Sequence, residues 1–278
     1  MNNLPKNLCV FILLCILFFS PSQNILFAET SSDDEDKLNK EFLLNFGDDF
    51  VDVLASPKNW KGGDFLSLSA VLGVGLLLYA VEQDIQQWAQ DHRSSSSEDY
   101  FKTVGYLGNG VVLLGLVTAL YASGEVSDNN SLRKTALLSL ESCLTTGIIV
   151  RGLKSVTGRA RPWTGESSHS FHLFSTRSRF ASFPSGHAST AFAMATIIAD
   201  QSKKVYIDIL AYSLATMAAL SRVHLDQHWA SDILVGSAIG YFVAKKISAL
   251  DRNRDSKKMK LGFQFSRQRQ AFSLIYYF

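Results

Sequence analysis

Long apolar runs alternate with short polar stretches along most of this chain of 278 residues. Two of the runs, 65–81 and 104–123, are nearly uncharged and match the roughly 17 to 25 residues that cross a bilayer as a helix. Four further runs have helical length but are shorter or carry a charge, and they cover 135–153, 188–199, 206–220 and 233–250. The pattern predicts an all-α core of six helices, which either span a membrane or pack as a soluble bundle.

The segments before this core are of two kinds. Residues 1–28 hold one lysine, an apolar run and a break at Pro21 before Ala28, a pattern typical of an export signal or an uncleaved signal anchor. Residues 29–64 are polar and begin with an acidic run, which we interpret as solvated. We therefore expect the helical core to cover 65–250.

The stretch after the core, 251–278, is a basic tail. Residues 261–266 and 271–278 within it are rich in aromatic side chains and alternate only partly between apolar and polar positions. This pattern predicts a short β-hairpin at the C-terminus.

Composition does not decide the class of protein, but it argues against a nucleic-acid partner and against a disulfide framework. A content of 47% hydrophobic and 19% charged residues lies between globular and membrane proteins and does not decide between them. The formal charge of +2, with no basic run interleaved with aromatics, argues against nucleic acid as a partner. Cys9 and Cys15 lie in the leader and Cys143 is the third cysteine, so the core has no internal disulfide framework.

The densest cluster of chemically active residues lies between the last two apolar runs. His228 and Asp232 are four residues apart, so a helix beginning near Trp229 would place the carboxylate beside the imidazole. A histidine oriented in this way is a nucleophile or a base. Arg222, six residues before His228, has a planar fork suited to phosphate or carboxylate oxygens.

A second cluster follows the third apolar run. Lys154 and Arg161 are seven residues apart, about two helical turns, so both cations are expected to face one way and to clamp an anion. The alternative is a basic helix end that interacts with its own dipole or with membrane headgroups.

The third cluster, Phe183-Pro184-Ser185-Gly186-His187, directly precedes the fourth apolar run. A helix that begins here leaves unpaired N–H groups in front of it, which form a cradle for an anion. The same letters also describe an ordinary turn and helix cap. An up-and-down bundle brings all three clusters to one end, where like charges repel unless an anion lies among them.

These motifs resemble the type 2 phosphatidic acid phosphatases, together with the related bacterial non-specific acid phosphatases and vanadium haloperoxidases. The family signature is Lys, six residues, Arg-Pro; then Pro-Ser-Gly-His; then Ser-Arg, five residues, His, three residues, Asp. The chain matches all three parts in order between Lys154 and Asp232. The resemblance implies a six-helix bundle of this family's kind, embedded in a membrane.

The resemblance also implies a role for each motif residue. His228 would attack phosphorus, Asp232 would orient His228, and His187 would protonate the leaving oxygen, which requires His228 neutral and His187 protonated. The residues expected to hold the phosphate oxygens are Lys154, Arg161, Ser185, Gly186 and Arg222. Fixed cations would then stabilise the charge of the transition state, and no metal or other cofactor is expected.

Other residues near the motifs allow further interpretations. A metal site made of His224, Asp226, His228 and Asp232 is one rival, but it leaves the Lys154 and Arg161 clamp unexplained. His224 and Asp226 are otherwise expected at the rim of the site. His169 and His172 are expected to be exposed loop residues, and Trp163 and Trp229 to pack or to lie at an interface.

The expected activity is metal-independent hydrolysis of a phosphomonoester or diphosphate through a phosphohistidine. A phosphorylated lipid is the expected substrate, of the phosphatidic acid, phosphatidylglycerol phosphate, lipid A or prenyl diphosphate type. The alternatives are a soluble exported acid phosphatase of broad specificity, a vanadate-dependent haloperoxidase and a non-catalytic membrane protein.

Topology gives conflicting indications. Lys203-Lys204 and the lysines of the tail lie at the end opposite the motifs, so the positive-inside rule places the site outside the cytosol. Counting six spans after an exported leader places it inside. Either one early segment does not cross, or the leader is not an export signal, or the bundle is soluble. We expect a bacterial-type inner membrane with the site facing the periplasm or exterior, and a soluble periplasmic protein is the alternative.

Overall fold

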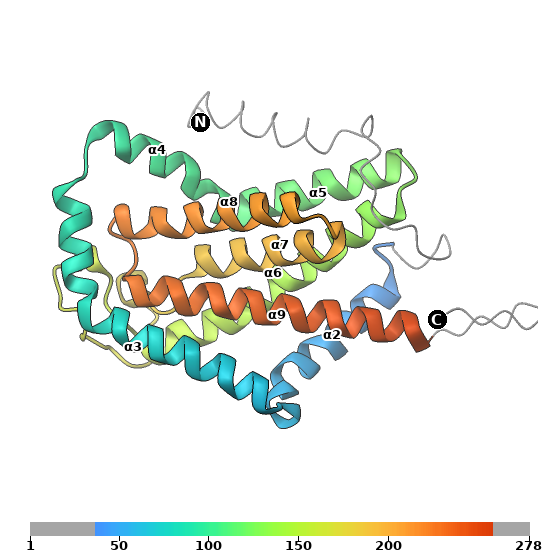
Figure 1. The fold of residues 1–278 in the computed structure, drawn as a ribbon, viewed down its shortest axis with the longest axis horizontal. Helices are drawn as coiled ribbons and strands as arrows, with labels where there is room; N and C mark the ends of the chain where they lie inside the picture. The colour runs from blue at the N-terminus through green and yellow to red at the C-terminus, as the bar shows by residue number, and fades with distance from the viewer. Residues whose placement is uncertain (1–36, 258–278) are drawn as a thin grey trace, which may run out of the picture.

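The computed structural model describes residues 37–257, and this part of the chain forms eight α-helices (Figure 1). The helices are α2 (Lys40–Ala55), α3 (Gly62–Asp91), α4 (Ser95–Gly105), α5 (Gly110–Val126), α6 (Asn130–Thr157), α7 (Gly186–Ser202), α8 (Val205–His224) and α9 (Ala230–Lys257). The all-α bundle is therefore confirmed. The expected leader and C-terminal hairpin lie outside the described residues.

Helix α7 forms the centre of the bundle and packs against α6, α8 and α9 (Figure 1). Small side chains make this close packing possible, because they let helix backbones approach one another. Five alanines of α7 are buried, and Gly236 and Gly240 of α9 face its first two turns. A Cβ atom at Gly236 would lie 2.5 Å from the carbonyl oxygen of Ser185. The two helices that begin at the site end are thus held together by backbone contact.

The four helix ends that carry the motifs lie at one end of the bundle. Helices α6 and α8 end there, and α7 and α9 begin there. The long loop between α6 and α7, drawn in yellow, gathers at the same end (Figure 1). The lysine pair Lys203-Lys204, between α7 and α8, lies at the opposite end.

Three of the described helices, α3, α6 and α9, are long and apolar enough to cross a membrane. Helices α4 and α5 pass the same test only together, and they meet at an angle of 56°. Large apolar side chains of α3 such as Leu66, Leu76 and Leu77 are exposed, so this helix presents an apolar surface outward. The expected helix over 104–123 is therefore interrupted, because Tyr106–Gly108 forms a 3₁₀ turn and Asn109 caps a new helix with its side chain.

Helix α2 lies within the segment that the sequence indicated only as polar. Its buried Asp49 faces the bundle and accepts a hydrogen bond from Arg254 of α9 at 2.6 Å. Leu43, Leu44 and Val51 are exposed on its outer side. Asp49 and Val53 of this helix thus face the bundle, whereas several of its leucines point away from the protein.

Candidate active site

The loop between α8 and α9 brings Arg222 and His228 together. The carbonyl oxygen of Arg222 accepts hydrogen bonds from the backbone N–H groups of Gln227, at 2.9 Å, and His228, at 3.2 Å. The backbone therefore doubles back within six residues. This turn places the last cation of α8 beside the histidine that precedes α9.

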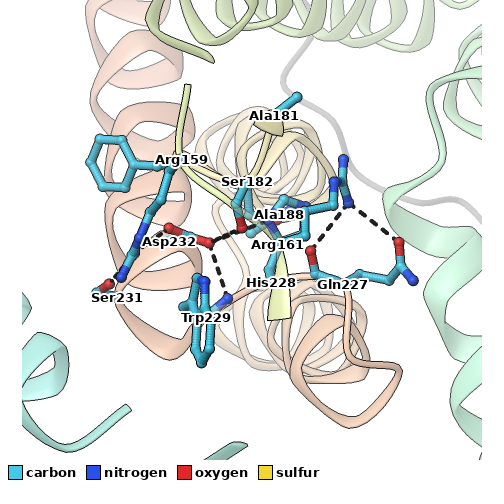
Figure 2. A network of polar contacts seen from close by, with 12 residues as sticks. Arg159, Arg161, Ala181, Ser182, Ala188, Gln227, His228, Trp229, Ser231 and Asp232 are labelled. Atoms are coloured by element: carbon cyan, nitrogen blue, oxygen red, sulfur yellow. Dashed lines mark hydrogen bonds and ion pairs between the residues drawn. The ribbon is translucent and has the colours of Figure 1, made fainter. Parts of the chain in front are cut away.

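Asp232 lies behind His228 in the first turn of α9, as its spacing predicted. The two oxygen atoms of its carboxylate have different partners (Figure 2). Oδ2 accepts from Ser182 Oγ at 2.5 Å and from the Trp229 N–H at 3.0 Å, and it lies 3.6 Å from His228 Nδ1. The second ring nitrogen of His228, Nε2, faces away from this carboxylate. Burial lowers the pKa of His228 well below its usual value despite the nearby Asp232, so the imidazole is neutral at pH 7.

Lys154 and Arg161 reach the site by a route other than the one their spacing suggested. Helix α6 ends at Thr157, and Gly158 adopts the left-handed conformation with φ of 58°. Lys154 therefore lies in the last turn of the helix, whereas Arg161 lies in the extended chain that follows. Lys154 Nζ donates to the carbonyl oxygen of Ala181 at 2.6 Å. Arg161 Nη1 donates to the carbonyl oxygen of Gln227 at 3.1 Å (Figure 2).

The Pro-Ser-Gly-His motif begins α7. Ser185 is fully buried, and its Oγ accepts from the Ala188 N–H at 3.4 Å as the N-cap of the helix. Its backbone N–H donates to the carbonyl oxygen of Asp232 at 2.9 Å. Gly186 and His187 then occupy the first turn, where N–H groups have no partner within the helix. The Ser185 side chain thus stabilises the helix end, and the N–H groups after it are oriented for an anion.

His187 lies among the cations that the motifs supply. Burial, and after it the positive charges of Arg222, Arg161 and Lys154, lower the pKa of His187 to about 3. With these neighbours the imidazole of His187 is neutral at pH 7, so the expected protonated form requires a bound anion. Nε of Arg222 is buried without a hydrogen-bond partner, so the site offers at least one unused cationic donor. Because like charges surround a neutral imidazole, the arrangement favours a bound anion.

Sequence reasoning missed Arg159, which supports Asp232 from behind. Arg159 is 1% exposed, and its Nη1 donates to Asp232 Oδ1 at 2.6 Å (Figure 2). Its Nη2 forms an ion pair with Glu82 of α3, which is also fully buried. The alternation of Arg159 with Arg161 in an extended chain was the one available signal, because such side chains point to opposite sides.

The last turns of α3 also contact the site loops, and the sequence indicated this only indirectly. Gln86 donates to Asp226 Oδ1 at 2.7 Å, and Gln90 donates to the carbonyl oxygen of His224 at 3.3 Å. With Glu82, these residues form a polar stripe at spacings of four directly after an apolar run. A polar stripe on one face of a helix indicates a polar neighbour.

The remaining candidate residues have contacts outside the group of cations and imidazoles described above. The ring of His224 lies tilted against that of Phe101, with ring centroids 4.2 Å apart, and its Nε2 lies 3.0 Å from Ser97 Oγ. His169 and His172 are exposed, as expected. Trp163 is exposed, and Trp229 is buried with Nε1 donating to the carbonyl oxygen of Ala160. Between residues 37 and 257, no three His, Cys, Asp or Glu side chains gather as metal ligands.

A large apolar groove of about 730 Å³ begins beside the site residues Arg222 and His228. The end of the groove nearest the site is lined by Val223 and His224, which follow Arg222, and by Ala230, two residues after His228. It continues between α3, α8 and α9 as far as Val71 and Phe242. The residues that line it include no aspartate, glutamate, lysine or arginine. The exposure of Trp88, Leu220 and Phe242 shows that the groove is open at the side of the bundle.

Comparisons with known proteins match this chain to one superfamily. Residues 135–255 match the PAP2 superfamily model. The lipid A 1-phosphatase of Porphyromonas gingivalis is 39% identical over 66 residues, which are 23% of this chain and 15% of that protein. The probable diacylglycerol pyrophosphate phosphatase 1 of Schizosaccharomyces pombe is 31% identical over 157 residues, 45% of this chain and 56% of that protein. The chain thus spans less than two thirds of these relatives' length.

The fold also has a counterpart among solved structures. The first transmembrane PAP2 type phosphatidylglycerolphosphate phosphatase from Bacillus subtilis superposes with a TM-score of 0.53. The match is 22% identical in sequence and covers 66% of this chain and 96% of that one. This likeness gives the fold, and the long apolar helices support a membrane protein.

Proposed function

Because residues 135–255 of this chain belong to the PAP2 superfamily, we propose that it is a phosphatase that hydrolyses phosphorylated lipids through a phosphohistidine. The observation that carries the proposal is a neutral, carboxylate-backed His228 at the same end of the bundle as three cations and a second imidazole. A phosphate group matches this combination of charge and nucleophile. The named relatives act on phosphorylated lipids, which supports the same substrate class here.

The reaction begins with attack of His228 Nε2 on phosphorus, since Nδ1 faces Asp232. A nitrogen–phosphorus bond forms while the bond from phosphorus to the ester oxygen breaks. Arg161, Arg222 and Lys154 offset the charge on the non-bridging oxygens, and the first N–H groups of α7 add hydrogen bonds. Asp232 stabilises the positive charge that develops on the imidazole.

His187 moves the proton. The imidazole of His187 is neutral at pH 7 before substrate binds. A bound phosphate dianion offsets the surrounding cations and raises the pKa of His187. The protonated imidazole then donates its proton to the leaving oxygen. Water next attacks the phosphohistidine, gives its proton to the now neutral His187, and releases phosphate and free His228.

The apolar groove is the proposed binding site for the hydrocarbon chain of the substrate. Along α3 it extends from Val71 to Trp88, about 25 Å at 1.5 Å per residue, which exceeds the roughly 15 Å depth of one leaflet. A chain that moves from lipid tails into this groove gains little free energy, because both surroundings are apolar. The groove therefore orients a lipid ester rather than tightening its binding.

Phosphate release from a long-chain lipid phosphate and from a water-soluble aryl phosphate, both with chelator present, tests this proposal. Ala238→Phe narrows the groove and is expected to lower kcat/KM for the lipid about tenfold, or ~1.4 kcal/mol, while the soluble ester changes less than twofold. Ala70→Phe, at an exposed position of α3 outside the groove, is the matched control. Equal losses of kcat/KM on both substrates would contradict the groove as the binding site of the hydrocarbon chain. Absence of any phosphatase activity would contradict the proposed function.

We further propose that the site faces away from the cytosol. Lys203, Lys204, Lys245 and Arg254 lie towards the opposite end, and positive residues favour the cytosolic side. In this orientation α3 begins on the cytosolic side, which favours a leader that is not a cleaved export signal. The membrane is then the inner membrane of a bacterial-type cell.

A further inference from the structure

Glu82 is a buried charged residue on a helix that otherwise presents an apolar surface outward. Large apolar side chains of α3 such as Leu66 and Leu77 are exposed, yet the Glu82 side chain is 0% exposed. Gly75, Glu82 and Ala89 are the buried positions of α3, and their spacing of seven forms one stripe along the helix. The stripe faces α9, so α3 turns its one buried charge towards the helix that carries Asp232.

Arg159 connects Glu82 to the active site and has no unused donor. Its Nη2 pairs with Glu82 Oε1 and donates to the carbonyl oxygen of Ser168, to which Nε also donates. Its Nη1 donates to Ser231 Oγ at 2.9 Å and to Asp232 Oδ1 at 2.6 Å. The guanidinium is therefore fixed in one orientation, and its charge is shared by two carboxylates.

Ser231 completes the connection on the side of α9. Its Oγ donates to Glu82 Oε2 at 2.5 Å while it accepts from Arg159. Both carboxylate oxygens of Glu82 thus have partners. Glu82 holds Arg159 and the first turn of α9 together.

We propose that Glu82 is a positioning residue for the phosphatase reaction, acting through Arg159 on Asp232 and His228; this inference rests on the proposed function. The three buried charges of Glu82, Arg159 and Asp232 sum to one negative charge. Arg159 and Asp232 alone would sum to zero, so no net negative charge would remain to stabilise the imidazole as it attacks phosphorus. Glu82 preserves that charge and keeps the carboxylate of Asp232 directed at Nδ1.

Glu82→Gln tests the inference, because it keeps the shape of the side chain and removes its charge. We expect kcat to fall at least about tenfold with KM nearly unchanged, since the charge is needed when His228 becomes bonded to phosphorus. Inhibition by orthovanadate, which can accept a fifth ligand as phosphorus does in the transition state, should weaken by a similar factor. Inhibition by inorganic phosphate, which binds without that bond, should change less than twofold.

Asp49→Asn is the matched control. Asp49 is 3% exposed and paired with Arg254, so this variant also neutralises a buried, arginine-paired carboxylate, but away from the motif helix ends. It should leave kcat and the ratio of the two inhibition constants unchanged. A parallel loss of vanadate inhibition, phosphate inhibition and heat stability in Glu82→Gln would reduce Glu82 to a structural role. Wild-type kcat in that variant would overturn the inference while leaving the function intact, whereas an inactive wild type would overturn the function itself.

Discussion

The two active-site histidines need different protonation states for the reaction, although the structure lowers the pKa of both. Asp232 stands behind His228 and supports its role as nucleophile. Burial and the surrounding cations together hold the pKa of His187 at about 3, and a bound anion offsets the cations. Substrate binding and protonation of His187 are therefore coupled, so the enzyme takes up a proton when it binds phosphate.

This coupling predicts a measurable proton uptake. Calorimetric titration with inorganic phosphate at pH 7, in buffers of different ionisation enthalpy, should show the wild type taking up roughly 0.5 to 1 proton more per site than His187→Asn. The variant corrects for protons bound by phosphate itself. Because binding raises the pKa of His187, phosphate affinity should rise as the pH falls through the raised value and decline above it. Equal uptake by both proteins would remove His187 as the proton donor.

Residue spacing predicted the motif residues better than it predicted their support. Lys154, His187, Arg222 and His228 could be named because each lies in a short contiguous pattern at a helix end. The partners of Arg159 could not, because Glu82 is 77 positions away and its burial depends on how α3 packs. A lone glutamate after an apolar run is equally consistent with a solvated helix end.

Among the helices, α7 and α9 form the closest pair, and their contact sets the geometry of the site. Ser185 and Asp232 are joined through the backbone where Gly236 lies against α7. Gly240 continues this contact one turn further along α9. An added methyl group there would separate the two helices that carry His187 and Asp232.

Gly240→Ala should therefore destabilise the protein. Its Cβ would lie 2.9 Å from the Ala193 nitrogen, and such overpacking costs about 1 to 3 kcal/mol. Gly73→Ala is the control, because no atom lies within 4 Å of its Cβ, and the better helix propensity of alanine stabilises by up to ~1 kcal/mol. Heating both variants in detergent and measuring the folded fraction checks the prediction. If Gly240→Ala unfolds no earlier than Gly73→Ala, the helices are not in backbone contact.

The apolar pattern predicted which segments are helical but not how the helices begin and bend. The break at Asn109 depends on its side chain capping α5, which apolarity alone does not indicate. Helix α2 buries Asp49 and leaves Leu43 and Leu44 exposed, so hydropathy could not assign its position. The ends of α3 and α9 extend beyond the apolar runs because their polar turns contact other parts of the protein.

At the scale of the molecule, the bundle has a phosphate-binding end and a lysine-rich end. The proposed orientation places the first outside the cytosol. Cysteines introduced at exposed Phe174 and at Lys203 should therefore differ in reactivity in intact cells, in a background without native cysteines. A membrane-impermeant maleimide should label Phe174→Cys directly and Lys203→Cys only after permeabilisation. The reverse pattern would contradict the orientation but not the chemistry.

The covalent bond between His228 and phosphorus is the most direct test of the account. The enzyme is mixed with a lipid phosphate labelled in its phosphoryl group, and the reaction is quenched rapidly without acid. Peptide mapping should then place the label on His228. The label should be absent from His228→Ala, whose phosphate release should fall to background. Label on another residue, or full activity in His228→Ala, would contradict the account.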